Sequence, residues 1–489
     1  MNYIKPEQAG ISSVNIKKFI DALEEYQLST HDVIIARGDD ILFEKYWTPF
    51  HQNFLHRMYS VSKSIVSLAI GFAEQDGLLS LDDKISKYFE KELIRQTDKN
   101  MHNQTIRHML MMSTAKPDRH WFNDKPEDRV QYYFDNDAPQ SRPSGTVFRY
   151  DSSGSFVLCA LVERLTGMTF MEYLKIKLFD KIGVSEKAYC LKCPGGHSWG
   201  DSGVLCTAKD LLLIARFVMN KGKWKGEQIL NEAYVTAAVS KQIDNNATNT
   251  MAIDSSGYGY LIWRTYDKSF FFNGMGCQFA VCVPDKDIIF IYNGDNQGNP
   301  LAKSIILENF FRYIVRASVN DALPENRQAE EELAAETELM VAKGELYSEF
   351  QERINGKEYL LMPNPMGITK LSLCFTDNIC QLRYTNAQGD KVISFGMGKN
   401  VIDKFPQEGY SDMVGTESTT NFYYRCASSA AWVEPKKLFI KVQVIDTYFG
   451  RLNITIGFLN ENSIGIYMNK TAEDFLKEYN GFAEGFSNH

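Results

Sequence analysis

A lysine stands at the start of a segment that is otherwise apolar and predicted to be helical. Most residues from Ser60 to Ala73 are apolar or small, which is typical of a helix buried in the centre of a domain rather than one on its surface. Isolated lysines are rarely buried, so Lys63 needs a partner there. Ser60, three residues earlier, projects from the same helix face. The segment therefore predicts a domain built around a central helix that carries a serine–lysine pair.

The Ser60 and Lys63 pair suits nucleophilic catalysis. A serine hydroxyl alone is a poor nucleophile near neutral pH, but a buried amine within hydrogen-bond distance can take its proton. The helix N-terminus adds a partial positive charge and free N–H groups, where an attacked carbonyl would become an oxyanion. The combination predicts acyl transfer. Ser113–Lys116 has the same spacing, but Pro117 follows at once, so no helix can carry that lysine inward.

A second candidate segment contains Tyr150 and Ser152. It follows a turn at 143–145 and precedes a predicted helix, Phe156–Leu165, which ends at Gly167. Tyr150 is therefore expected on a loop between elements, where functional side chains are often displayed. A packed tyrosine with a satisfied hydroxyl is the alternative interpretation.

A third candidate segment spans 271–285. It predicts a strand, a glycine-rich interruption at Gly274 and Gly276, a second strand and a turn at Pro284. Glycines in a strand permit close approach of a ligand to the backbone, and an exposed N–H there could be a second oxyanion donor beside that of Ser60. A simple bulge or hairpin turn is the alternative.

Together, Ser60-x-x-Lys63, Tyr150-x-Ser152 and the Asn273–Gly274 strand resemble the serine β-lactamase and penicillin-binding-protein superfamily. Within it the chain is most similar to the class C β-lactamase-like branch, which includes esterases, D-amino-acid peptidases and 6-aminohexanoate-oligomer hydrolases. Segments 199–211 and 220–230 resemble two further stretches of that branch. The resemblance covers roughly residues 1–315.

The resemblance implies a role for each motif residue. Ser60 would be the acylated nucleophile and Lys63 its proton acceptor. Tyr150 would relay a proton to the leaving group, alone or jointly with Lys63. Ser152 stands where the family often has asparagine, and it can still hydrogen-bond Lys63 or the substrate.

The third motif departs from the family's Lys-Thr-Gly or His-x-Gly triad. One alignment uses 272–274 and leaves the Met275 N–H as oxyanion donor, with Asn273 and Gly274 beside the substrate. A register two residues later would use the Cys277 N–H; spacing to the following turn favours the first. Neither places a cation at the first position, where Lys or His usually engages a substrate carboxylate. Penicillins and D-Ala-D-Ala peptides thus become less favoured, and neutral amides and esters more so.

Three further residues are candidates for the edge of the substrate pocket. Trp121, with His120, follows Pro117 on a loop that could line the entrance. Trp199 and Asp201 fall where the family has a pocket-edge loop. Structural packing is the alternative for each.

Composition excludes several partners. The net charge is −8 with no basic cluster, so neither nucleic acid nor an anionic membrane is expected. The segment Met1–Glu7 lacks the apolar core of a secretory signal, no run approaches the length of a membrane span, and nine scattered cysteines fit a reducing compartment. We therefore expect a cytoplasmic protein with a small-molecule or short-peptide substrate, and the sequence leaves homo-oligomers open.

No metal or cofactor is expected. Cys190 and Cys193, with His197 nearby, resemble half a zinc site, but no second pair follows at ligand spacing, so loop thiols are favoured. A cysteine- or metal-dependent enzyme stays as a minor alternative. Cys277, beside the expected pocket, is interpreted as a small packing residue.

A chain of 489 residues with 44% hydrophobic content can bury a large core and should form two domains. The predicted fold class is α+β, an α/β sandwich: an antiparallel sheet flanked by helices, with a helical lobe, over residues 1–318. An acidic helical connector is expected at 319–350. The short alternating strands of 351–489 predict a small antiparallel barrel or sandwich, and this segment resembles the lipocalin-like β-barrel that several members of the branch carry.

The chain is therefore predicted to be a serine hydrolase that acts through an acyl-enzyme on an amide or ester, as an esterase, amidase or peptidase. A β-lactamase or penicillin-binding protein is the runner-up within the enzyme class. A binding or sensing module that acylates slowly is the alternative of another class.

Overall fold

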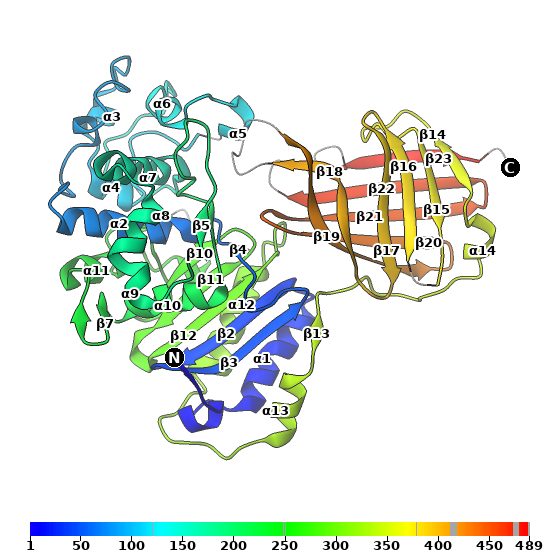
Figure 1. Ribbon diagram of the computed structural model, residues 1–489, viewed down its shortest axis with the longest axis horizontal. Coiled ribbons are helices and arrows are strands. Elements are labelled where there is room, and N and C mark those ends of the chain that lie inside the picture. The colour runs from blue at the N-terminus through cyan, green and yellow to red at the C-terminus, as the bar shows by residue number, and fades with distance from the viewer. Residues whose placement is uncertain are drawn as a thin grey trace. The chain divides into compact units, whose positions relative to one another are not determined.

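The computed structural model describes residues 1–119, 121–247, 249, 251–377, 379–410, 418–472 and 479–487. The chain divides into two compact units, the first spanning Met1–Thr337 and the second beginning at Glu338 (Figure 1). Each unit is described by itself. Helix α13 (Arg327–Ala334) packs within the first unit, where Lys45 Nζ donates to the carbonyl oxygens of Leu333 and Ala335 at 2.9 and 2.7 Å. The sequence-based boundaries at 318 and 350 stay predictions.

A mixed, mainly antiparallel sheet forms the centre of the first unit, with the strand order β1-β3-β2-β12-β11-β10-β9. Its strands are β1 (Asn2–Tyr3), β2 (Thr30–Arg37), β3 (Asp40–Thr48), β9 (Trp263–Arg264), β10 (Phe270–Gly274), β11 (Gln278–Val283) and β12 (Ile288–Gly294). Strands β2 and β3 form one hairpin and β11 and β12 another, and β2 pairs with β12 to join them. Nearly every residue of β2 and β12 is buried, because both faces of the sheet are covered.

Helices cover the two faces of this sheet (Figure 1). On one face Phe290 of β12 contacts Phe19 of α1 (Ser13–Glu25) and stacks on Phe310 of α12 (Ala302–Phe310), with ring centroids 5.4 and 4.4 Å apart. The opposite face packs on α10 (Ala208–Met219), whose Ala215 carbonyl accepts from the thiol of Cys282. The sheet is therefore the middle layer of an α/β sandwich, as predicted.

The central helix of the unit is α2 (Val61–Gln75), in which every residue from Val61 to Ala73 is buried. It packs against α7 (Ser152–Thr166), which ends at Gly167 in the left-handed conformation that glycine adopts without strain. The prediction of a buried central helix is confirmed. The remaining helices of the lobe are α3 (Lys99–Asn103), α4 (Ile106–Leu110), α5 (Trp121–Asp124), α6 (Arg129–Phe134), α8 (Phe170–Leu174), α9 (Asp180–Ile182) and α11 (Glu232–Val239).

Short strand pairs complete the first unit. Strand β6 (Val204–Cys206) lies between β4 (His56–Arg57) and β5 (Tyr189–Cys190), and β7 (Lys223–Trp224) pairs with β8 (Glu227–Gln228). Strand β4 matters most for the site, because it leads directly into the serine–lysine segment. The Ser113–Lys116 segment is not helical, as its proline predicts.

The second unit is all-β apart from α14 (Gln351–Ile354) in the part of the chain that the structure describes. Its strand order is β17-β16-β15-β14-β23-β22-β21-β20-β19-β18, and a parallel pairing of β17 with β19 at Gly396 and Met397 closes nine of these strands into a barrel. The strands are β14 (Glu358–Leu361), β15 (Lys370–Cys374), β16 (Cys380–Asn386), β17 (Gly389–Met397), β18 (Val401–Tyr410), β19 (Ser418–Glu434), β20 (Lys437–Ile445), β21 (Phe449–Asn460), β22 (Ser463–Ala472) and β23 (Gly481–Phe486). The predicted barrel is confirmed.

No single helix among the described residues is long and apolar enough to cross a membrane. One pair of helices bent by 70°, Ser152–Thr166 with Phe170–Ile182, has the length and composition to do so when taken together.

His56 makes the stability of the first unit depend on pH. Its ring is buried, with Nε2 2.8 Å from His31 Nδ1, and burial lowers the pKa of His56 to about 3. The unfolded chain, with a histidine pKa near 6.5, therefore binds more protons than the folded one between those values, and stability falls as the pH falls through this window. Between pH 7 and 4.5 this loss amounts to about 2–3 kcal/mol.

We expect His56→Gln to remove that loss, measured as the difference in unfolding free energy between the two pH values by urea denaturation. The exposed His51→Gln serves as the control and should keep the wild-type pH dependence. An unchanged pH dependence in His56→Gln would contradict the assignment.

Candidate active site

The backbone before α2 presents Ser60 at the helix N-terminus. The amide of Met58 donates to the Val204 carbonyl of β6 at 2.8 Å, which anchors the chain after β4. The chain then turns at Tyr59, whose φ of 46° lies in the left-handed region that a bulky residue rarely adopts. Ser60 follows as the half-buried residue that caps α2. The amides of Val61, Ser62 and Lys63 donate to the carbonyl oxygens of Met58, Tyr59 and Ser60 at 2.9–3.1 Å, so a tight turn fixes Ser60 at the start of the helix.

Lys63 lies one turn into α2, and its side chain is only 1% exposed. Its Nζ is 2.9 Å from Ser60 Oγ and donates to the backbone carbonyl of Asp201 at 2.6 Å. The ring of Tyr150 lies over the same nitrogen, 5.1 Å from Nζ to the ring centroid. Among the described residues no carboxylate forms an ion pair with this amine. Three chain segments far apart in sequence thus meet at one buried nitrogen.

Tyr150 is held in place from two sides. Its ring stacks on Trp263 of β9, with centroids 5.7 Å apart, and faces Lys63 on the other side. The next residue, Asp151, caps α7 by accepting from the Gly154 amide at 2.9 Å. Burial and the neighbouring Asp118 raise the pKa of Asp151 to about 6. Ser152 is the first residue of α7 and is half-buried.

The third motif is the tip of the β10–β11 hairpin. A side chain at Gly274 would have its Cβ 2.4 Å from the Met58 carbonyl oxygen, so the strand can approach the Ser60 turn this closely only with glycine. Met275 is exposed at the tip, and Asn273 is half-buried. The structure therefore brings the third motif beside the first, as the sequence analysis expected.

The hairpin geometry also bears on the two alignments of this motif. The Cys277 amide donates to the Gly274 carbonyl at 3.1 Å, so it closes the turn. The Met275 carbonyl accepts from Gln278 Nε2 at 2.7 Å, which fixes the peptide after Met275. This pattern favours the alignment that uses the Met275 N–H.

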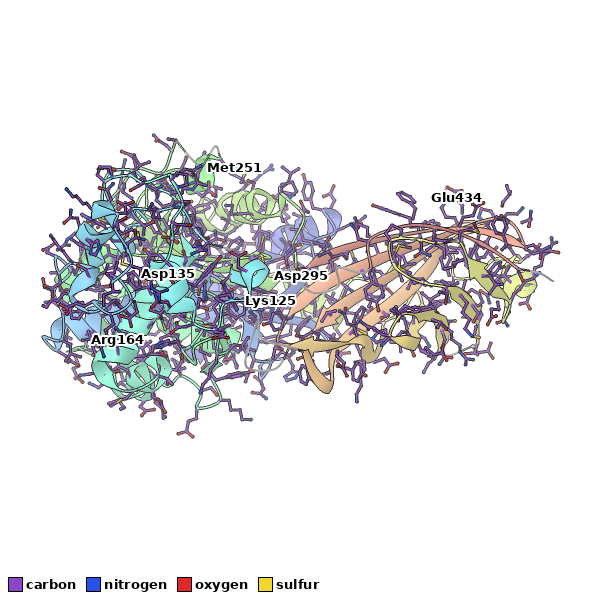
Figure 2. The ribbon with its side chains drawn as sticks, turned by 90° about the horizontal axis from the view of Figure 1, so that it is seen from above. Lys125, Asp135, Arg164, Met251, Asp295 and Glu434 are labelled. Atoms are coloured by element: carbon purple, nitrogen blue, oxygen red, sulfur yellow. The ribbon has the colours of Figure 1, made fainter. Side chains whose placement is uncertain are left out.

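The hairpin tip is tied to the loop after β12. The Asn296 amide donates to the Gly276 carbonyl at 3.1 Å, and the amide of Asp295, labelled in Figure 2, donates to the Ser29 carbonyl at 3.0 Å. The tip is therefore held by the loop after β12, and that loop is itself anchored to the chain at Ser29.

Trp121, Trp199 and Asp201 are all buried, and they contact one another or share Arg129 as a neighbour. The two indole rings meet edge to face at 5.3 Å, and Asp201 forms an ion pair with Arg129. Of the three residues, Asp201 contacts Lys63, through its backbone carbonyl. Contact of any of them with a substrate stays a prediction. His120 lies outside the described residues.

Cys190 and Cys193 are free thiols, and burial raises the pKa of both, for Cys193 to about 12. Burial likewise raises the pKa of Cys277 to about 12, which makes that thiol a poor nucleophile. The described residues contain no cluster of three or more His, Cys, Asp or Glu side chains that could hold a metal ion.

Sequence analysis missed two residues of the site, Arg129 and Trp263. Each acts through a contact between segments far apart in the chain, and neither belongs to a motif of fixed spacing. A buried arginine shows in the sequence only as one more charged residue, here next to Asp128.

The fold and this arrangement define a class of protein, and comparison with known proteins identifies it. The family model described as β-lactamase matches residues 16–304, more than half of the chain. The chain belongs to the β-lactamase family, a family of serine hydrolases.

Individual relatives are distant. A 6-aminohexanoate-dimer hydrolase of Paenarthrobacter ureafaciens is 22% identical over 263 residues, which cover 50% of this chain and 67% of the relative. A penicillin-binding protein of Bacillus subtilis is 22% identical over 189 residues, 35% of this chain and 40% of the relative. An octameric penicillin-binding protein homologue from Pyrococcus abyssi has the same fold, with a TM-score of 0.51 at 14% identity over 96% of this chain and 99% of that one.

Gly274→Val tests the close approach of the hairpin to the Ser60 turn. The added side chain must push β10 away from the Met58 carbonyl, so we expect a loss of about 1–3 kcal/mol in unfolding free energy and a larger fall in hydrolytic rate. Gly457→Ala, in β21, has open space around its Cβ and is the control that should leave both unchanged. Full activity in Gly274→Val would show that this contact is dispensable.

Proposed function

We propose that this protein hydrolyses a neutral ester or amide through an acyl-enzyme on Ser60. The observation that carries the proposal is the buried Lys63 amine, 2.9 Å from Ser60 Oγ, at the N-terminus of α2. An amine without a carboxylate partner, next to a hydroxyl at a helix N-terminus, is arranged to accept that hydroxyl's proton.

In the acylation half, Ser60 Oγ attacks the carbonyl carbon while its proton passes to Lys63 Nζ. The negative charge that develops on the carbonyl oxygen is stabilised by the N–H groups of Ser60 and Met275. When the tetrahedral intermediate collapses, the bond to the leaving group breaks. The leaving oxygen or nitrogen takes its proton from Lys63, with Tyr150 as the relay, and the acyl group stays on Ser60.

In the deacylation half, a water molecule attacks the same carbonyl carbon and gives a proton to the Lys63–Tyr150 pair. The acyl–oxygen bond to Ser60 then breaks, and Ser60 Oγ recovers the proton. The carboxylic acid leaves, and the enzyme returns to its starting state. Tyr150 serves both halves because its ring is fixed between Lys63 and Trp263.

The residue at the first position of the third motif supports a neutral substrate. Phe272 is fully buried on the same face of β10 as Gly274, where related motifs carry a cation. A carboxylated substrate would find no cation at this position, and burying an unpaired carboxylate is costly. The name of the Paenarthrobacter relative is also that of an amide hydrolase.

Assembly with further copies of the chain is part of the proposal. The Pyrococcus abyssi homologue that covers most of this chain is described as an octamer. A homo-oligomer is therefore the partner that we propose, with a small molecule or short peptide as substrate.

The nucleophile is tested with a fluorophosphonate probe and a p-nitrophenyl ester. We expect one adduct per chain, on Ser60 by peptide mass mapping, and none in Ser60→Ala. Lys63→Ala should reduce kcat for the ester by about 10³-fold, and Tyr150→Phe by about 10–10²-fold, with smaller changes in KM because neither group binds the ground state alone. Labelling without turnover above the Lys63→Ala level would favour the slowly acylating binding module instead.

The preference for neutral substrates is tested with two esters that share a leaving group, p-nitrophenyl butyrate and mono-p-nitrophenyl succinate. We expect kcat/KM for the anionic ester to be lower by about tenfold or more, because its carboxylate lacks a cation at Phe272. Nitrocefin, which also carries a carboxylate, should be turned over more slowly than the butyrate. Equal or faster turnover of the anionic substrates would favour the β-lactamase alternative.

A further inference from the structure

A buried ion pair lies next to the proposed catalytic lysine and includes the residue whose carbonyl accepts from it. Arg129, the first residue of α6, donates both terminal nitrogens to the carboxylate of Asp201, at 2.7 and 3.1 Å. Both side chains are almost fully buried. The guanidinium also lies over the rings of Trp121 and Phe156, 4.7 and 4.2 Å from their centroids. The pair therefore has one fixed geometry, since fork-like pairing and ring stacking both orient the guanidinium.

The same residue, Asp201, supplies the backbone carbonyl that accepts from Lys63 Nζ at 2.6 Å. Its side chain and its main chain thus connect the ion pair to the amine through a single residue. The preceding Gly200 is packed so tightly that a Cβ there would lie 2.4 Å from the Cβ of Cys159 on α7. The segment around Asp201 has little room to move.

A second arginine holds this segment from another direction. Arg57 of β4 stacks on Trp199, 4.4 Å from the ring centroid, and its Nε donates to the Ser202 carbonyl at 3.1 Å. Arg57 is only three residues before Ser60, so the segment that carries the serine and the segment that holds the lysine are joined directly. Arg129 joins the second of these segments to α6 and α7.

We propose that the Arg129–Asp201 pair is the positioning device of Lys63, and that it fixes the Asp201 carbonyl as the acceptor that aims the amine at Ser60. A lysine amine on a flexible four-carbon stem loses its aim unless a second partner fixes it. A buried ion pair is a poor source of stability compared with apolar packing, which agrees with a role in geometry. This inference rests on the proposed function of Ser60 and Lys63. Neither Arg129 nor Asp201 touches the substrate in this account.

Because the pair contains one positive and one negative charge, removing either charge should shift the pH profile of Ser60 activation in an opposite direction. The amine of Lys63 contacts the Tyr150 ring, Ser60 Oγ and the Asp201 carbonyl, so the Arg129–Asp201 pair adds a positive and a negative charge next to the segment that holds it. Asp201→Asn keeps the carbonyl and the shape but leaves the Arg129 cation, which disfavours a proton on the nearby amine. Arg129→Gln leaves the Asp201 anion, which favours it. The two substitutions should therefore shift the pH profile of nucleophile activation in opposite directions.

The experiment measures the rate constant of Ser60 labelling by a fluorophosphonate probe, and kcat and KM for p-nitrophenyl butyrate, across pH in the full chain. We expect the midpoint of the labelling profile to move down by about 1 pH unit in Asp201→Asn and up by about 1 unit in Arg129→Gln. Both variants should lose about tenfold or more in kcat, with KM within about threefold. Arg129→Lys, which keeps the cation, should restore the midpoint but only part of the rate.

Asp287→Asn is the matched control. Asp287 pairs with the buried Arg216 at the end of the β11–β12 hairpin away from the Met275 tip, so the same chemical change there should leave the labelling profile as in wild type. Thermal unfolding of each variant checks that the measured protein is folded. If Asp201→Asn does not accumulate as folded protein, the midpoint and rate of Arg129→Lys test the positioning role instead.

Different results would contradict the role of Ser60 and the role of the Arg129–Asp201 pair. Wild-type protein without a Ser60 adduct would overturn the proposed function itself. Wild-type labelling with unshifted midpoints, or with shifts in the same direction, in Asp201→Asn and Arg129→Gln would overturn only the positioning role and leave the pair as ordinary packing.

Discussion

The burial of one amine is the constraint on which the rest of the catalytic unit depends. Lys63 lies inside an apolar helix that the sheet and α7 enclose, and its Nζ must find polar partners there or pay the full cost of desolvation. It finds them in Ser60 on its own helix and in the carbonyl of Asp201. Because these partners come from segments about 140 residues apart, satisfying one nitrogen also fixes the relative placement of two parts of the lobe.

The sheet contributes the other half of the site through its topology. Strands from the beginning and the end of the unit pair as β2 with β12, so the hairpin that follows β10 is carried to the N-terminus of α2. The contact there is between main chains, with Gly274 against the Met58 carbonyl, and it leaves room for no side chain. On the other side of this contact, Tyr59 has a left-handed backbone conformation, which is strained for a bulky residue. Strain and a missing side chain at the same point are typical of a backbone shaped for catalysis rather than for stability.

Local patterns in the sequence predicted the elements of this site, and long-range contacts decided what surrounds it. The apolar run after Ser60, the helix end at Gly167 and the hairpin signals near Gly274 are short-range features, and each is found where it was expected. Arg129 carries no such signal, because its role comes from pairing with Asp201, 72 residues away. Trp121 and Trp199 show the same limit: the sequence left open whether each lines the pocket or packs inside the protein, and it gave no sign of the buried arginines on which they lie.

The electrostatics of the site follow from these placements and agree with an uncharged substrate. Two buried cations of the lobe are occupied by other side chains: Arg129 pairs with Asp201, and Arg57 lies over the rings of Tyr59 and Trp199. The third motif contributes Phe272, which is apolar and buried. In the proposed mechanism, the reacting carbonyl therefore faces the N–H dipoles of Ser60, at the end of α2, and of Met275, at the hairpin tip. The amine of Lys63 lies beside them. Such dipoles stabilise charge that appears during the reaction and offer little to a substrate that is already charged. A site built this way gains its rate in the transition state, and this is the arrangement expected for a hydrolase of neutral esters and amides.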